Sequence, residues 1–272
     1  MRFFMGKFFL FSIFSLCLSS LLLAEELQTK EDSTQPFHIF ASTGYAWGMN
    51  SGIANPQPGF WDIVDNGYNQ NMGNVSYLSL GFGYCIKNAL DVNFNYNLYD
   101  TFHYQMLQTS SLQQTGTVRV RYFDLNHQNA LITSIWYPYK KRIGGSSWKI
   151  SPLLGMGIGV GISQVSNFYT VGNNANGTLA NVPYTQTVGL GSITSEGNPV
   201  TTIAFAWQGI GGIHLEANKY LYLDLSYRYY NGGKFLCPST IYSFVDQAFF
   251  SGSPWKGVLQ TNELNIQIAV RF

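Results

Sequence analysis

Apolar and polar residues alternate without a break over residues 264–272 of the chain. Leu264, Ile266, Ile268, Val270 and Phe272 share one parity, and polar or small residues fill the positions between them. Because side chains on a β-strand point alternately to opposite faces, this pattern predicts a strand with one apolar face. That apolar face continues to a terminal aromatic residue.

The same period of two recurs in seven earlier segments, so the sequence predicts eight strands in all. Within one of them the apolar parity changes, because Val118, Val120 and Tyr122 share one parity while 131, 133, 135 and 137 share the other. This change predicts a β-bulge or an irregular crossing between Phe123 and Ala130. The seven segments are Phe37–Gly48, Asn74–Ile86, Leu90–Leu98, a stretch within Val118–Tyr137, Trp148–Ser163, Thr201–Glu216 and Leu221–Tyr230.

Polar residues fill the second face of several of these strands. Asp91, Asn93, Asn95 and Asn97 alternate with five large apolar residues. Four polar side chains in a row can face neither hydrocarbon nor a dry core without partners, so they predict a polar interior. On 148–163 the inward face carries four glycines, which leave space for bulky side chains opposite. The same G-x-G-x-G pattern would fit a nucleotide loop only if a turn and a helix followed, and neither follows.

The connectors between predicted strands alternate in length. They are short after the second, fourth and sixth strands, and long at about 50–73, 105–117, 166–199 and 231–260. Short turns on the periplasmic side and long loops outside are typical of outer-membrane β-barrels, with both termini periplasmic. Two predicted aromatic girdles fit this arrangement. The outer girdle holds Tyr45, Trp47, Phe102, Tyr104, Tyr227 and Tyr229, and the inner girdle holds Phe37, Tyr84, Tyr137, Trp148 and Phe272.

The amino-terminal 24 residues have the layout of a secretory signal peptide. Arg2 and Lys7 precede a short apolar core at 8–16, and Ala24 offers a cleavage site. Cys17 suggests a lipoprotein signal instead, but Leu16 before it is large for that peptidase. We therefore expect a signal peptide at 1–24, a disordered periplasmic lead-in at 25–36 and a barrel at 37–272.

The composition indicates that part of the surface of this protein faces something other than water. The 272 residues are 46% hydrophobic, 16% aromatic and 11% charged, whereas a soluble domain carries about 25% charged residues. Without Arg2 and Lys7, 13 of the 15 basic side chains remain against 14 acidic ones. This charge balance provides no excess of positive charge with which to bind nucleic acid. Cys85 and Cys237 fall near opposite ends of the predicted barrel, so we expect no disulfide, metal site or cofactor.

Five segments resemble the opacity-protein and outer-membrane-protein-A-like family of transmembrane β-barrels from Gram-negative bacteria. The resemblance implies an all-β fold, an eight-stranded antiparallel up-and-down barrel with long extracellular loops. It also implies that the barrel-assembly machinery reads Phe272, with Ile266, Ile268 and Val270 beside it. The segments are FDLNHQNAL at 123–131, SPLLGMGIGVG at 151–161, FAWQGIGG at 205–212, LSYRY at 225–229 and the terminal Phe272.

Inward charged and amide residues predict a paired network in the lumen. An eight-stranded barrel has an interior just wide enough for side chains, and unpaired charges there would be costly. Arg228 and Glu263 lie on adjacent strands at similar depth, so we expect them to pair. The full predicted network is Asp91, Asn93, Asn95, Asn97, Lys149, Asp224, Arg228, Glu263 and Arg271.

Some eight-stranded outer-membrane barrels modify lipid A, and in such an enzyme a histidine could serve as the base. A lipid deacylase pattern of His-x-Ser is absent, because 38, 103, 127 and 214 are followed two residues later by Phe, Gln, Asn and Glu. His214 and Glu216 share the inward face but lack an evident serine or cysteine nucleophile. We therefore expect no enzymatic activity.

The fourth long connector contains a stretch that is unusually apolar for a loop, 240–250. It predicts either a short helix on the barrel mouth or an exposed contact patch. The sequence thus favours a non-enzymatic surface protein in contact with outer-membrane lipid and lipopolysaccharide, whose loops meet host or envelope partners. A small porin and a lipid-A-modifying enzyme are the alternatives. The candidate contact residues are Ile241, Tyr242, Phe244, Phe249 and Phe250.

Overall fold

The computed structural model describes residues 36–49, 72–86, 89–107, 117–144, 147–174, 187–188, 191–244 and 246–272. None of these residues forms a helix long and apolar enough to cross a membrane. The predicted signal peptide and nearly all of the lead-in at 25–36 lie outside the described residues. So do most of the predicted loop at 50–73 and the turn at Lys87 and Asn88.

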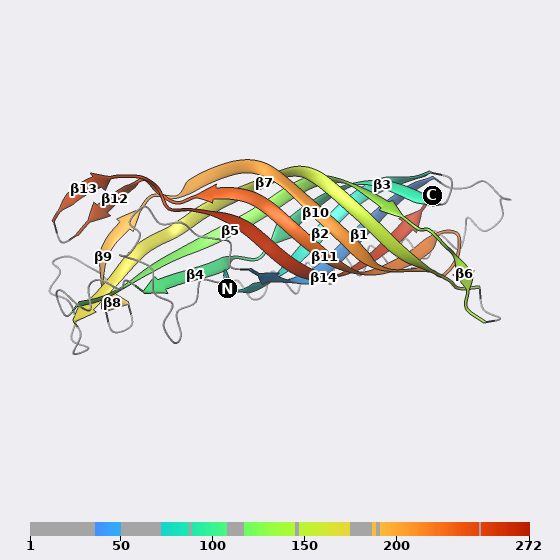
Figure 1. The fold of residues 1–272 in the computed structure, drawn as a ribbon, viewed down its shortest axis with the longest axis horizontal. Coiled ribbons are helices and arrows are strands. Elements are labelled where there is room, and N and C mark those ends of the chain that lie inside the picture. The colour runs from blue at the N-terminus through green and yellow to red at the C-terminus, as the bar shows by residue number, and fades with distance from the viewer. Residues whose placement is uncertain are drawn as a thin grey trace.

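Eight long strands form one closed antiparallel barrel (Figure 1). Neighbours in sequence order pair with one another, and β14 pairs with both β11 and β1, which closes the cylinder. This pairing confirms the predicted all-β, eight-stranded, up-and-down architecture. The barrel strands are β1 (Phe37–Gly48), β2 (Asn74–Ile86), β3 (Leu90–Tyr99), β5 (Thr117–Trp136), β7 (Lys149–Asn174), β10 (Val200–Glu216), β11 (Leu221–Leu236) and β14 (Lys256–Arg271).

An apolar band covers the outside of this barrel, as the alternation predicted. Every second residue of each strand points outward, and a closed barrel with such a band is suited to hydrocarbon rather than water. The structure is therefore a transmembrane β-barrel. The most exposed large side chains of the band include Ile39, Leu80, Phe82, Leu98, Ile132, Leu154, Met156, Ile158, Ile203, Phe205, Leu264 and Ile266.

The two ends of the barrel differ. One end, here the short-turn end, holds the C-terminus and the small strand β6 (Lys141–Arg142), seen at the right of Figure 1. At the other, the long-loop end, the strands continue well past the apolar band and acquire further strands. These are β4 (Phe102–Leu107), β8 (Thr187–Val188), β9 (Gly191–Gly197), β12 (Thr240–Ser243) and β13 (Ala248–Ser251).

The predicted long loops at 166–199 and 231–260 are therefore wrong in large part, because strand pairing continues through them. Most of the predicted loop at 105–117 lies outside the described residues. β4 pairs with β5 and β9 pairs with β7. β11 and β14 stay paired as far as Leu236 and Lys256, across a register shift between Asn231 and Gly233. Gly233 has a φ of 81°, a left-handed conformation that glycine adopts without strain. We call this added wall the extension; it comprises residues 102–107, 117–127, 164–174, 191–202, 231–236 and 256–261.

Inside the extension the barrel has an apolar core, which the sequence analysis did not anticipate. Phe102 and Tyr104, assigned to the outer girdle, are instead 0% and 2% exposed and face inward. The reason is that a sheet standing in water buries its apolar face and shows its polar one, the reverse of a sheet in lipid. The core also contains Phe123, Leu125, Val165, Phe168, Tyr230, Phe235, Cys237, Trp255 and Leu259.

The predicted fourth strand is one continuous strand of 20 residues, β5. Its register against β7 shifts between Tyr122 and Asp124, at the edge of the predicted window, and 124–136 is regular. Leu131, Ile135 and Tyr137 face the lumen, so the assignment of Tyr137 to the inner girdle is wrong. It packs with Ile135 and Leu153 in a small apolar cluster inside the wall.

Candidate functional site

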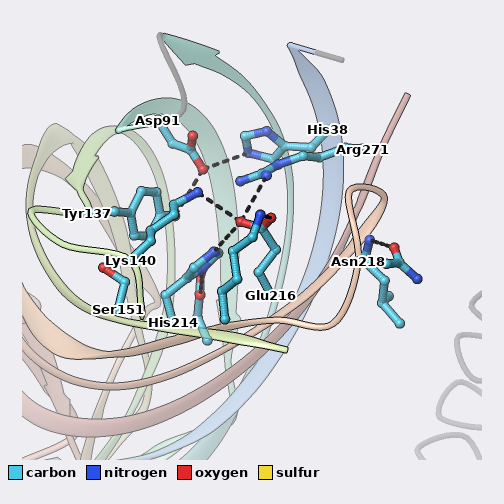
Figure 2. Close-up of polar contacts among 12 residues, drawn as sticks. His38, Asp91, Tyr137, Lys140, Ser151, His214, Glu216, Asn218 and Arg271 are labelled. Carbon is cyan, nitrogen blue, oxygen red and sulfur yellow. Dashed lines mark hydrogen bonds and ion pairs between the residues drawn. The ribbon is translucent and has the colours of Figure 1, made fainter. Parts of the chain in front are cut away.

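A cluster of charged side chains closes the lumen at the short-turn end, and Glu216 is its centre (Figure 2). The Nζ atoms of Lys140 and Lys149 each lie 2.9 Å from a carboxylate oxygen of Glu216, and Nη1 of Arg271 lies 3.7 Å away. Lys149 is the direct partner of Glu216 in the β7–β10 register. Lys140 comes from the turn after β5, so the sequence pattern gave no sign that it enters the lumen. We call these four residues the Glu216 cluster.

His214 and Asp224 form a buried pair beside this cluster. They are direct partners across β10 and β11, and His214 Nδ1 lies 2.6 Å from Asp224 Oδ1. The ring of Tyr137 packs on His214 at 4.3 Å between centroids. This packing and the hydrogen bond together fix the orientation of the imidazole.

Ser151 is the partner of His214 on its other side, in β7. Asp224, His214 and Ser151 therefore form one row of acid, base and hydroxyl, which the sequence analysis missed because the three lie on separate strands. The Ser151 hydroxyl donates to the Pro152 carbonyl at 2.8 Å. Ser151 and His214 are both fully buried, so the row offers a substrate no point of contact.

A third group completes the closure at this end. His38 Nε2 lies 2.9 Å from the Asn93 amide oxygen and 3.9 Å from Asp91 Oδ2. The Tyr137 hydroxyl donates to the same Asp91 oxygen at 3.0 Å. Side chains across the lumen thus join β1, β3 and Tyr137, the residue that follows β5.

The middle of the lumen is lined by neutral polar side chains. Gln208 donates to the Thr133 hydroxyl at 2.7 Å, and that hydroxyl donates to Asn95 at 2.8 Å. A cavity of about 30 Å³ lies among these residues, which is room for one or two water molecules. The middle layer is therefore nearly filled.

Arg228 and Glu263 form a second charged layer in the lumen, nearer the long-loop end than the Glu216 cluster. They are direct partners across β11 and β14, and the guanidinium donates to the Glu263 carboxylate. Arg228 also donates to Asn97 at 3.3 Å and to the Tyr99 hydroxyl at 3.2 Å, and it lies 4.6 Å from the ring centre of Tyr77. Each partner of this pair is 5% exposed or less.

Aromatic rings continue the filling above this layer. Tyr99 stacks on Tyr230 at 5.7 Å between centroids, and the Tyr230 hydroxyl lies 2.7 Å from His127 Nε2. His127 Nδ1 in turn lies 2.9 Å from the Ser163 hydroxyl. From here the apolar core of the extension begins.

All nine predicted network residues face the lumen, but they form separate layers. Lys149 and Arg271 belong to the Glu216 cluster, and Asp91, Asn93 and Asp224 lie beside it. Asn97, Arg228 and Glu263 lie nearer the long-loop end, and Asn95 lies between the two layers. Reasoning from sequence missed Tyr77, Tyr99 and Lys140. Parity assigns a face to a residue, but it does not reveal how far a tyrosine or lysine side chain reaches across a barrel.

The apolar stretch at 240–250 forms a β-hairpin, so the short helix proposed for it is wrong. β12 pairs with β13 and also with β9, which adds the hairpin to the wall of the extension. Tyr242 packs against Phe244 and Phe249 at 5.1 and 5.0 Å between centroids. Phe249 is 70% exposed and Phe250 is 50% exposed, while Ile241 packs on the core.

The residues predicted to guide assembly lie on the outer surface of β14. Ile266 and Ile268 are exposed and Val270 is half-buried. The Phe272 ring stacks on Phe37 at 6.5 Å between centroids. No group of three or more His, Cys, Asp or Glu in the described part of the chain is arranged to hold a metal ion.

No protein-family model matches the sequence, and no curated protein matches it either. Among solved structures, the chain is similar to Neisserial surface protein A (NspA), with 15% identity and a TM-score of 0.42 over 87% of this chain and 97% of that one. It is also similar to the outer membrane protein OprG from Pseudomonas aeruginosa, with 14% identity and a TM-score of 0.44 over 88% and 98%. A third is Ail, the attachment invasion locus protein of Yersinia pestis, with 13% identity and a TM-score of 0.33 over 87% and 99%. These values are low, so the fold assignment rests on the strand pairing of the chain itself.

Proposed function

We propose that this protein is a non-enzymatic surface protein of the Gram-negative outer membrane, with a closed barrel as anchor and the extension as its functional part. The observation that carries the proposal is the filling of the lumen. The Glu216 cluster, the Arg228–Glu263 pair and the apolar core of the extension succeed one another along the barrel axis. A side-chain plug of this kind suits an anchor better than the porin alternative.

Conductance in planar bilayers tests this proposal. The purified full chain is expected to insert without producing steady channels, because side chains fill the lumen from the Glu216 cluster to the apolar core of the extension. A detergent-matched porin serves as the positive control for insertion. Regular conductance steps that scale with the amount of inserted protein would show that the barrel is an open pore and not a closed anchor.

The geometry around His214 supports the absence of enzymatic activity. Its Nε2 lies 3.9 Å from Glu216 Oε2, and the Ser151 hydroxyl is engaged with a backbone carbonyl. A nucleophile needs a hydrogen bond to its base and an open approach for substrate. Mass spectra of lipid A from strains with and without the gene are expected to coincide, and a missing or added acyl chain would identify an enzyme instead.

The proposed location places the long-loop end outside the cell and both barrel termini in the periplasm. The apolar band would then contact lipid and the membrane-embedded part of lipopolysaccharide, while the barrel-assembly machinery would read Phe272. An epitope inserted at Asp246, in the turn of the β12–β13 hairpin, should be labelled on intact cells. An epitope in the turn at Gly144 should be labelled only after the outer membrane is permeabilised.

The β12–β13 hairpin supports a role in contact with host or envelope partners, because Phe249 and Phe250 are exposed at the far end of the extension. Cell binding by the full chain should fall when 240–250 is deleted. Cell binding should fall equally in a Phe249→Ala, Phe250→Ala double variant, which keeps the hairpin backbone. Unchanged binding in both variants would remove the hairpin from the proposal.

A further inference from the structure

A second surface feature lies on the outer face of the extension, on β4, β5 and β7. A cavity of about 340 Å³ opens there, and Tyr122 and Tyr169 both line it. They are direct cross-strand partners, and their rings stack at 5.2 Å between centroids with 23° between the planes. The volume of this cavity falls at the lower end of the range for small-molecule sites, and the two rings give the cavity an aromatic surface.

Polar groups converge on the same cavity. The Asp124 carboxylate is held by two neighbours, His103 Nδ1 at 2.6 Å from one oxygen and the Asn167 amide, which donates to the other at 2.6 Å. His103 has 75% of its side chain exposed and Asp124 has 22%. Burial and the nearby Asp124 carboxylate raise the pKa of Tyr169, so its hydroxyl stays protonated and can donate a hydrogen bond.

The backbone around the cavity is shaped in two places. The β5–β7 register shift lies between Tyr122 and Asp124, and such irregularities re-aim side chains on a sheet. Asn167 has a φ of 50°, a left-handed conformation that asparagine adopts more readily than most other residues with a side chain. Both features fall on residues that line the cavity.

The chemistry of the lining selects among ligands. None of the described residues that line the cavity is lysine or arginine, so an anion would find no permanent positive charge, and His103 is already engaged with Asp124. Asp124 already accepts two hydrogen bonds, which reduces its attraction for a small cation. A pyranose ring fits this set, because its C–H face packs on aromatic rings while its hydroxyls exchange hydrogen bonds with a carboxylate, an amide and an imidazole.

We propose that this cavity is a binding site for a neutral saccharide. The ring would pack against Tyr122 and Tyr169, with Asp124 as hydrogen-bond acceptor for two hydroxyls and Asn167 and His103 beside it. This site rests on the proposed function, since it requires the extension to stand outside the cell. The saccharide can come from sugar chains of lipopolysaccharide in the same membrane, or from glycans that are free or on another cell.

Saturation-transfer NMR on the full chain in lipid nanodiscs tests the proposal. One arm uses the methyl glycosides of glucose, galactose and mannose, and the other uses lipid-free polysaccharide released from the producing strain's own lipopolysaccharide. Binding in either arm supports the site, and the arm that binds more tightly identifies the source. Tyr122→Ala and Asp124→Asn should each weaken binding about tenfold or more, as expected for loss of one stacking or charged hydrogen-bonding partner.

Tyr139→Ala is the matched control, because Tyr139 is an exposed tyrosine at the short-turn end and should leave binding unchanged. The proposal is overturned by silence in both arms, or by binding that survives both cavity variants. Saturation by tetramethylammonium or by a sulfated sugar in place of the neutral probes would also overturn it. Planar-bilayer conductance is independent of this result, so failure of the saccharide site is distinguishable from failure of the closed anchor.

Discussion

Phe40 and Gly81 face each other across β1 and β2 inside the lumen. The Phe40 ring lies over the glycine, so that a Cβ at position 81 would overlap the ring and approach the Phe94 carbonyl. The glycine thus provides the space that Phe40, the largest inward side chain of β1, requires. Small and large residues are matched here across one register position.

Gly81→Ala should destabilise the barrel by about 1–3 kcal/mol, the usual cost of overfilling a packed interior. Unfolding by urea in detergent micelles, followed by tryptophan fluorescence, measures the loss. Part of it should return in a Gly81→Ala, Phe40→Leu double variant, because the smaller side chain vacates the space. If the double variant loses the sum of the two single effects, the pair is not coupled.

Arg228→Ala should cost about 3–5 kcal/mol, because it leaves the Glu263 carboxylate buried without its charge partner. The same unfolding measurement reports the loss, and heat-modified migration on gels should begin at a lower temperature. The matched control replaces both partners, Arg228→Met with Glu263→Leu. This apolar pair is expected to lie closer to the parent protein than the single variant does. A single variant as stable as the parent would show that the pair contributes little.

Glu216→Gln should loosen the short-turn end, because it leaves Lys140, Lys149 and Arg271 close together without the carboxylate they share. We expect a loss of about 1–3 kcal/mol, smaller at high salt because Lys149 has 39% of its side chain exposed to solvent. Proteolysis within 138–148 should become faster. Glu196→Gln, an exposed site on β9, serves as the control and should change neither quantity.

Cys237 should react very slowly with alkylating agents. It is 1% exposed in the core of the extension, where burial raises the pKa of its thiol from 9.0 to about 12. Because only the thiolate reacts, the reactive fraction at pH 8 falls by about a thousandfold relative to an unshifted thiol. Mass spectrometry of a Cys17→Ser, Cys85→Ser chain treated with iodoacetamide measures this, and urea should restore rapid modification. Rapid labelling of the folded chain would mean that the extension is open.

The transmembrane half of the fold could be predicted from sequence because lipid and lumen impose opposite polarities on alternate residues. Asn93, Asn95 and Asn97 interleaved with Val92, Phe94 and Tyr96 define both faces of β3 without any tertiary information. The closed ring of eight strands follows from repetition of that pattern.

The extension could not be predicted in the same way, because the rule reverses where the wall leaves the membrane. In β5, Phe123 and Leu125 point inward while Asp124 and Asn126 point out. When one strand passes from lipid into water, the apolar residues change from its outward to its inward face. In the sequence this change of parity looks the same as a break in the strand. The cavity beside Tyr122 was missed for a further reason, since it joins residues of β4, β5 and β7 that no short motif connects.

The length of β7, 26 residues, sets how far the protein reaches. At about 3.3 Å per residue and a tilt of about 40°, such a strand rises roughly 65 Å, twice the hydrocarbon thickness of about 30 Å. The half of the barrel toward the long-loop end, which includes the extension, therefore stands above the lipid headgroups as a continuous hydrogen-bonded wall. A partner would meet this protein at a height fixed by the sheet, and shortening β5, β7, β11 and β14 together would lower the contact point without altering the surface that makes it.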